Sequence, residues 1–236
     1  MKMMRLTALD LLFPRNSLLG DEGALVTERE EKILAASAPV ITERPQLREA
    51  RVEFLDRIVA AADYERVPLL RGAIHAFKYR RVRGVGEALG RMIVRASVLF
   101  PSPPNPLSRE SLALLGARER GDLPVLCPVP LHWTRKFSRG FNQAALLAEA
   151  VSRGRGWTVL DLLRRTRPTG HQTRKSREER FAGVRDAFDV RLRIELPRYV
   201  ILVDDLATTG ATMDMCAKVL KREGVERVEG LVVAMG

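Results

Sequence analysis

Residues 199–212 read YVILVDDLATTGAT and decide the fold. The first five residues are apolar, rich in β-branched side chains and without polar alternation, which is typical of a strand buried on both faces of a parallel sheet. Asp204 and Asp205 follow directly, then a loop of small residues, and from Ala211 apolar residues recur at helical spacing. Open α/β sheets bind ligands where a strand leads through a loop into a helix. The stretch therefore predicts an α/β fold with a parallel sheet flanked by helices.

The loop after the acidic pair has the composition of a phosphate-binding site. Small side chains let backbone N–H groups approach an anion, threonine hydroxyls add donors, and the helix N-terminus supplies partial positive charge. Two carboxylates beside a phosphate would repel it unless they face a sugar diol or a metal ion shared with the ligand. An acidic surface turn is the alternative, and no P-loop motif of the form G-x-x-x-x-G-K-[ST] occurs. The predicted phosphate-binding residues are Ala207, Thr208, Thr209, Gly210, Ala211 and Thr212.

Length and composition indicate a soluble globular protein. The chain has 236 residues, of which 46% are hydrophobic and 29% charged, and no apolar run approaches the ~20 residues that span a bilayer. The run Leu6–Phe13 is interrupted by Asp10 and lacks a small-residue cleavage pattern, which argues against a secretion signal. Cys127 and Cys216 lie far apart in apolar segments. We interpret them as reduced core residues of a cytoplasmic protein.

The formal net charge of +11 is concentrated in one stretch. Residues 135–198 sum to +9, whereas residues 199–236 sum to −2. A basic stretch of this kind attracts polyanions, either pyrophosphate or nucleic acid. For residues outside the motifs, an arginine-rich composition without a binding role is the alternative.

Helical patterns predominate in the first 100 residues. Leu6–Phe13 and Glu28–Ala36 fit short helices, Gly84–Phe100 fits an amphipathic helix, and apolar residues on one face predict a further helix over residues 47–61. Proline residues predict a break between Pro39 and Pro45. We divide the chain into an N-terminal helical or hood region, residues 1–66, and a main domain.

A second stretch, residues 123–143, reads LPVLCPVPLHWTRKFSRGFNQ and repeats the arrangement of strand, loop and helix. Residues 123–126 suit a short buried strand, and the proline-rich loop after it would share a sheet edge with the predicted phosphate loop if the two strands are parallel. Arg139 precedes the helix and can direct its guanidinium fork at phosphate oxygens. An ordinary proline-rich turn and helix start are the alternative.

These motifs together resemble those of a known superfamily and family. A hydrophobic strand, two acidic residues and T-T-G-x-T resemble the phosphoribosyl-pyrophosphate (PRPP) signature of type I phosphoribosyltransferases. The runs C-P-x-P…R-G-F-N-Q, R-T-R-P-T-x-x-Q-T at 165–173, R-x-x-R-F-x-x-V-R-x-A-F at 177–188 and A-F-K-Y at 76–79 resemble the ComF family of competence proteins, the GntX-like branch. The match covers about residues 70–236. Family members usually begin with a four-cysteine zinc finger, but residues 1–60 contain no cysteine, so no zinc site is expected.

The resemblance implies a type I phosphoribosyltransferase fold over residues 67–236 and a set of site residues. Asp204 and Asp205 would bind the ribose hydroxyls and hold Mg²⁺ together with PRPP, and with Arg139 they would form the catalytic group. The pyrophosphate loop would comprise Pro128, Val129, Pro130, Leu131 and Arg139. A flexible lid over residues 164–188 would contribute Gln172, Arg177 and Arg180, and Lys78 is a further candidate contact to pyrophosphate.

Two functions remain open on the sequence. The resemblance implies an enzyme that transfers a phosphoribosyl group from PRPP to an acceptor with release of pyrophosphate, and the acceptor is not identified by any motif. The alternative is a non-catalytic competence or DNA-uptake factor that binds single-stranded DNA and works with competence or recombination proteins. The basic stretch supports contact with nucleic acid, and a steep salt dependence of DNA affinity that is lost when Arg174, Lys175 and Arg177 are neutralised would separate such a site from nonspecific attraction.

Overall fold

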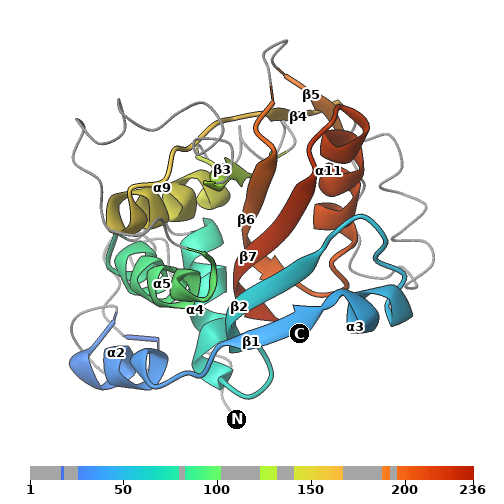
Figure 1. The fold of residues 1–236 in the computed structure, drawn as a ribbon. Coiled ribbons are helices and arrows are strands. Elements are labelled where there is room, and N and C mark those ends of the chain that lie inside the picture. Colours follow the sequence, from blue (N-terminus) through green and yellow to red (C-terminus); the bar gives the residue numbers. More distant parts are fainter. Residues whose placement is uncertain are drawn as a thin grey trace.

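The computed structural model describes residues 17–18, 26–79, 83–101, 123–131, 141–166, 188–191 and 196–236. Within these ranges, the centre of the protein is a five-stranded sheet (Figure 1). Four neighbouring strands are parallel, and an antiparallel strand forms one edge. In spatial order the strands are β1 (Val40–Glu43), β2 (Arg57–Asp63), β7 (Arg227–Met235), β6 (Tyr199–Ala207) and β3 (Val125–Pro128). The α/β fold with a mostly parallel sheet is confirmed.

Helices cover both faces of this sheet (Figure 1). One face packs against α2 (Glu28–Ala35), α4 (Pro68–Tyr79), α5 (Arg83–Ala96), which continues into the short 3₁₀ helix η1 (Ser97–Leu99), and α9 (Gln143–Arg155). The other face packs against α3 (Arg44–Glu49), α11 (Ala211–Arg222) and a hairpin of β4 (Leu163–Arg165) and β5 (Phe188–Val190). None of the described helices is both long and apolar enough to cross a membrane.

Strand β6 belongs to two hydrophobic cores at once. Ile201 and Val203 lie in the core beneath α4, α5 and α9, while Val200 and Leu202 lie in the core beneath α11. All four side chains are fully buried. Because both faces are covered, the strand has no polar alternation, and the predicted buried strand is confirmed.

The chain reverses its direction of travel across the sheet between β3 and β6. After β3 it passes through α9 and returns beside β3, where Leu126 forms a parallel bridge with Val159 on the side away from β6. After β6 it passes through α11 to β7, in the opposite direction. The carboxyl ends of β3 and β6 therefore flank a topological switch point, which is where doubly wound sheets bind ligands.

Several predictions for the N-terminal third need correction. The helix over residues 47–61 is wrong: α3 ends at Glu49, and residues 57–63 form β2. The apolar run in β2 pairs with β7 and is buried on both faces, and periodicity alone cannot tell such a run from a buried helix. The expected break after Pro39 contains β1. Two strands of the sheet thus come from before residue 67, and the division of the chain at that residue stays a prediction.

Other predicted elements fit closely. Helix α2 begins after Thr27, whose hydroxyl accepts the Glu30 N–H while the Glu30 carboxylate accepts the Thr27 N–H, a capping box. Helix α5 covers most of its predicted range, and α9 is the helix that was expected after Arg139. Strand β3 begins two residues later than expected and includes Cys127 and Pro128. The expected helix at Leu6–Phe13 lies outside the described residues.

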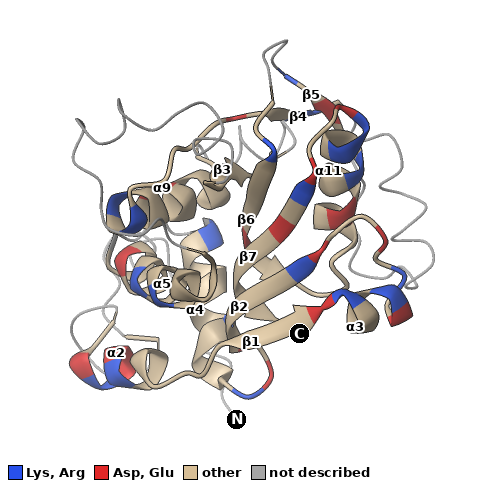
Figure 2. Cartoon of the chain, viewed as in Figure 1, with Lys and Arg blue, Asp and Glu red and all other residues tan. Residues whose placement is uncertain are grey.

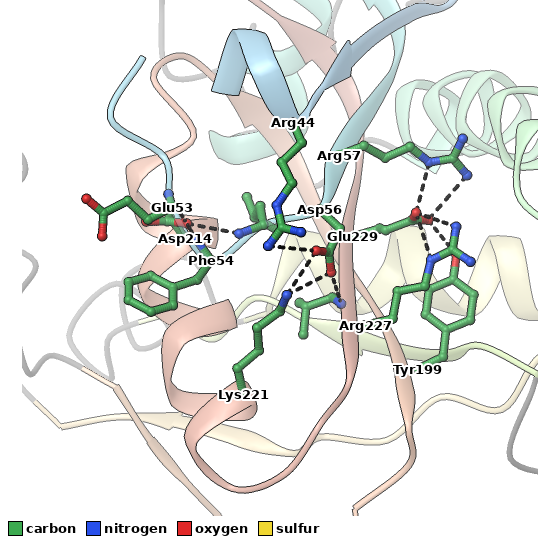
Figure 3. Close-up of polar contacts among 12 residues, drawn as sticks. Arg44, Glu53, Phe54, Asp56, Arg57, Tyr199, Asp214, Lys221, Arg227 and Glu229 are labelled. Carbon is green, nitrogen blue, oxygen red and sulfur yellow. Dashed lines mark hydrogen bonds and ion pairs between the residues drawn. The ribbon is translucent and has the colours of Figure 1, made fainter. Parts of the chain in front are cut away.

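At the amino ends of the parallel strands, a buried carboxylate joins three strands (Figure 3). Glu229 of β7 is only 2% exposed and pairs with Arg57 of β2 at 3.0 Å and with Arg227 at 2.6 Å. The Tyr199 hydroxyl of β6 donates to the same carboxylate, and burial together with Glu229 strongly raises the pKa of Tyr199. This polar cluster lies at the amino ends of the parallel strands, whereas the switch point lies at their carboxyl ends.

Candidate functional site

The acidic pair lies inside β6, not after it. The ladder between β6 and β7 continues past Asp204, which is opposite Val232, to Ala207, which is opposite Met235. The strand is longer than its apolar run because β7 is equally long and offers pairing to its end. Successive side chains on a strand point to opposite faces, so the two carboxylates lie on different faces of the sheet.

Asp205 lies on the face covered by α4, and it is paired with a lysine. Its side chain is 7% exposed, and its Oδ1 atom lies 2.9 Å from Nζ of Lys78, which is in the last turn of α4. The Lys78 side chain is 23% exposed and therefore still reaches solvent. The structure thus brings together two residues that are 127 positions apart in the sequence.

Asp204 lies on the face covered by α11 and keeps some contact with solvent. Its Oδ1 atom accepts the backbone N–H of Asp205 at 2.8 Å. Burial and the neighbouring charge of Asp205 raise the pKa of Asp204 to about 7, although Lys78, this hydrogen bond and Arg165 act in the opposite direction. The two adjacent carboxylates therefore differ: Asp205 is neutralised by an ion pair, whereas Asp204 is close to protonation at neutral pH.

Arg165 is a residue of the site to which the sequence assigned no role. Arg165 ends β4, and its positive charge partly offsets the rise in pKa that burial causes at Asp204 and at Cys216. The guanidinium also lies over the ring of Phe188, 5.2 Å from its centroid. Arg165 and Phe188 are paired in the antiparallel ladder between β4 and β5. The R-T-R-P-T run, which begins at this arginine, was the available sequence signal.

The predicted phosphate loop turns sharply at Gly210, a position where the backbone requires glycine. Gly210 has φ +73° and ψ −5°, in the left-handed region, and it is the N-cap residue of α11. A Cβ atom there would lie 3.2 Å from the Ile58 side chain and 3.3 Å from that of Val52. Gly210 offers no side-chain cap to the helix, while Thr209 Oγ1 accepts the Ala211 N–H at 3.4 Å. The start of α11 is therefore suited to an anion that takes the place of a cap.

Asp214, in the first turn of α11, anchors the segment beneath this loop (Figure 3). Its Oδ1 atom accepts the backbone N–H groups of Glu53, Phe54 and Leu55 at 3.1, 2.7 and 3.1 Å, and the residue is 2% exposed. Burial raises the pKa of Asp214, and the three hydrogen bonds oppose that shift. Sequence reasoning missed this residue, whose signal was an acid on the otherwise apolar face of the helix.

The loop after β3 forms the other wall of the site. The Val129 N–H donates to the carbonyl of Val203 at 2.9 Å, so Pro128 and Val129 lie beside the end of β6, next to Asp204. Asn142, the N-cap residue of α9, donates its Nδ2 hydrogen to the Val129 carbonyl at 3.2 Å. The structure therefore places the predicted pyrophosphate loop and the acidic pair at one edge of the sheet. The remaining predicted contacts, Arg139, Gln172, Arg177 and Arg180, lie outside the described residues.

Two other features of the described residues bear on ligands. The described residues contain no group of three or more His, Cys, Asp and Glu side chains that could hold a metal ion by itself. A groove of about 1300 Å³ lies between α2, α5 and α9, with Phe77 and Phe141 among its lining residues. Most of its lining comes from α2, α5 and α9 and none from β6 or the start of α11, and we do not assign it to the site. Figure 2 shows Lys and Arg interspersed with Asp and Glu on the outer helices.

Comparison with known proteins identifies relatives of this chain. No family model matches the chain. DNA utilization protein YhgH of Escherichia coli is 33% identical over 183 residues, covering 73% of this chain and 69% of that protein. Competence protein F of Haemophilus influenzae is 36% identical over 111 residues, covering 44% of this chain and 47% of that protein. Competence protein ComFC of Streptococcus pneumoniae is 36% identical over 101 residues, covering 43% of each protein. The chain therefore belongs to the ComF family.

Proposed function

We propose that the protein binds PRPP at the switch point and transfers its phosphoribosyl group to an acceptor, with release of pyrophosphate. The observation that carries the proposal is the neighbourhood of three features at one sheet edge: the acidic pair of β6, the left-handed Gly210 that opens α11, and the loop after β3. PRPP offers a ribose diol to the carboxylates, a 5-phosphate to the loop that opens α11 and a pyrophosphate to the loop after β3. The Lys78 ammonium beside Asp205 adds positive charge.

Mg²⁺ fits this site only in company with the ligand. Mg²⁺ commonly takes one or two protein carboxylates and completes its octahedral coordination with water and substrate phosphates. Asp204 and Asp205 offer two carboxylates, but Lys78 already occupies one of them. We infer that Asp204 would hold the ion with oxygens of PRPP, where it would neutralise charge on the departing pyrophosphate.

The residues of the chain would act mainly by positioning and by charge. The bond between C1 of the ribose and the pyrophosphate oxygen breaks as the acceptor bonds to C1, and positive charge builds up on the sugar in between. The carboxylates favour that charge, while Lys78 and the predicted Arg139 favour the leaving pyrophosphate. Arg165, on the face of the sheet covered by α11, would favour the ionised form of Asp204.

Pyrophosphate release tests the proposed reaction. The protein would be incubated with PRPP and Mg²⁺ and, in turn, with single nucleobases, nucleosides and small amines, while pyrophosphate is measured. We expect release that depends on one acceptor class, and a loss of at least about 100-fold in Asp205→Asn, because an electrostatic contact made at the transition state is removed. Glu226→Gln, an exposed carboxylate in the turn after α11, is the matched control. Release at the wild-type rate in Asp205→Asn would contradict the proposal.

A second candidate function follows from the relatives. One is named for DNA utilization and two for competence, and residues 135–198 of this chain carry a net charge of +9. In this alternative the protein binds single-stranded DNA and need not turn over PRPP. DNA affinity that falls steeply as salt is raised, and that is reduced in Arg174→Gln, Lys175→Gln, Arg177→Gln, would favour it. An unchanged affinity in that variant would exclude this basic segment as the DNA site.

A further inference from the structure

Three consecutive residues at the start of α9 connect the two walls of the site. Gln143 is 1% exposed, and its Nε2 atom donates a hydrogen bond to the backbone carbonyl of Lys78 at 3.2 Å. Two residues earlier, the ring of Phe141 packs edge-on against Phe77, with centroids 6.2 Å apart. The last turn of α4, which carries Lys78, is thus attached to α9 by one polar and one aromatic contact.

Asn142, which lies between Phe141 and Gln143, holds the other wall of the site, the loop after β3. The Asn142 side chain accepts the Ala144 N–H at 3.1 Å and so caps α9, and it donates to the Val129 carbonyl at 3.2 Å. Val129 in turn is hydrogen-bonded to β6. The segment 141–143 therefore fixes the end of α4 and the loop after β3 relative to each other and to the acidic pair.

This arrangement matters because of where Lys78 lies in its helix. The last carbonyls of a helix have no partner within the helix, and a helix end without an outside partner frays. Lysine has a long, flexible side chain, so fraying of the backbone beneath it would free the ammonium from Asp205. The buried amide of Gln143 supplies one such outside partner at the residue that carries the ammonium.

We propose that Gln143 is a positioning residue, which holds the last turn of α4 so that Lys78 stays against Asp205 and faces the phosphates of the ligand. The nature of the ligand rests on the proposed function, but the contact between Gln143 and α4 does not. Gln143 itself acts through Lys78 and touches no reacting atom.

The test uses Gln143→Leu, which replaces the side-chain amide with an apolar group of similar size and so removes the donor. Gln46→Leu is the matched control, because Gln46 is exposed on α3. Two quantities are measured in the full chain: amide hydrogen exchange of residues 74–79, and the Kd of PRPP with Mg²⁺. If Gln143→Leu does not fold, Gln143→Met replaces it, since methionine is unbranched and close to glutamine in length.

We expect faster exchange over residues 74–79 and PRPP binding that is weaker by about tenfold, the scale of one hydrogen bond. In a Lys78→Gln background, Gln143→Leu should cause no further loss of affinity, because the two residues act through the same contact. Gln46→Leu should change neither quantity. Exchange as slow as in the wild type, or the same tenfold loss without Lys78, would overturn the proposal.

The two proposals can fail separately. If the wild-type protein binds no PRPP, the proposed function is wrong, and hydrogen exchange alone then decides whether Gln143 holds α4. If PRPP binds to the wild type and to Gln143→Leu with equal affinity, PRPP binding stands and the positioning role is wrong.

Discussion

Two adjacent aspartates occupy different environments, because a strand sends neighbouring side chains to opposite faces. Asp205 has its own cation at 2.9 Å, whereas Asp204 has only partial compensation. For Asp204 the folded pKa, about 7, lies above the ordinary value of 3.8. Between these values the folded protein keeps a proton that the unfolded chain has lost, so ionisation of Asp204 makes folding less favourable as the pH rises.

Asp204→Asn should remove this penalty. The amide keeps an oxygen that can accept the Asp205 N–H. In buffer with a chelator and no ligand, we expect the variant to be about 1–2 kcal/mol more stable than the wild type at pH 8, a figure reduced for the solvent contact of Asp204, and equally stable near pH 4. Denaturant unfolding over this pH range measures the effect, with the exposed Glu226→Gln as control. A difference that does not depend on pH would contradict the assigned environment.

Gly210 allows a second test at the scale of one residue. Gly210→Ala places a Cβ atom against Ile58 and Val52 at a backbone angle that alanine disfavours, and it should cost about 2 kcal/mol of stability. Gly224→Ala is the matched control, since Gly224 also has a positive φ, +97°, but an added Cβ meets nothing within 4 Å. PRPP affinity should fall in the first variant and stay constant in the second. Equal losses of stability in both would show that packing under the loop is unimportant.

At the scale of elements, the first turn of α11 and the segment before β2 depend on one carboxylate. Asp214→Ala would leave three backbone N–H groups without their acceptor, and we expect a loss of about 2–4 kcal/mol. Asp214→Asn keeps an acceptor oxygen and should lose clearly less. Thermal unfolding, with hydrogen exchange of residues 53–55, measures both effects. An equally large loss in the two variants would contradict the role of the three hydrogen bonds.

The amino ends and the carboxyl ends of the parallel strands have separate roles: the first stabilise the fold, and the second form the proposed ligand site. Glu229→Ala would leave Arg57 and Arg227 without their buried partner, and it should destabilise the protein by about 3–5 kcal/mol. Because the cluster lies at the amino ends of the strands, PRPP affinity of the folded protein should not change. Removing the exposed pair of Glu226 and Arg198 should cost less than about 1 kcal/mol. Weaker PRPP binding in folded Glu229→Ala would contradict this division of tasks.

The sequence predicted elements well where a local signal matched the tertiary environment. The apolar run of β6, the capping box of α2 and the amphipathic α5 each have such a signal. The prediction from sequence failed for β2, because its apolar run fits a helical pattern equally well until β7 is known to lie beside it. The site shows the same limit: the acidic pair and the loop could be found from spacing, but the partners Arg165 and Asp214 depend on contacts that only the folded chain makes.

In the whole molecule, the proposed site depends on one arrangement: two strands that end at a switch point, with helices on both faces and charges of both signs at the carboxyl ends of the strands. Membership of the ComF family is established by relatives that align with up to 73% of the chain. Neither the fold nor the names of those relatives decides between phosphoribosyl transfer and DNA binding. The ligand of the acidic pair decides it.

Calorimetric titration of PRPP into the protein, with Mg²⁺ present, tests that central claim most directly. The wild type and a variant that combines Asp204→Asn with Asp205→Asn would be compared after thermal unfolding has shown that both are folded. We predict saturable binding of one PRPP per chain to the wild type and none to the variant, while ribose 5-phosphate binds more weakly because it lacks the pyrophosphate. Absence of binding to the wild type, or equal binding to the variant, would contradict the claim that this edge of the sheet is a PRPP site.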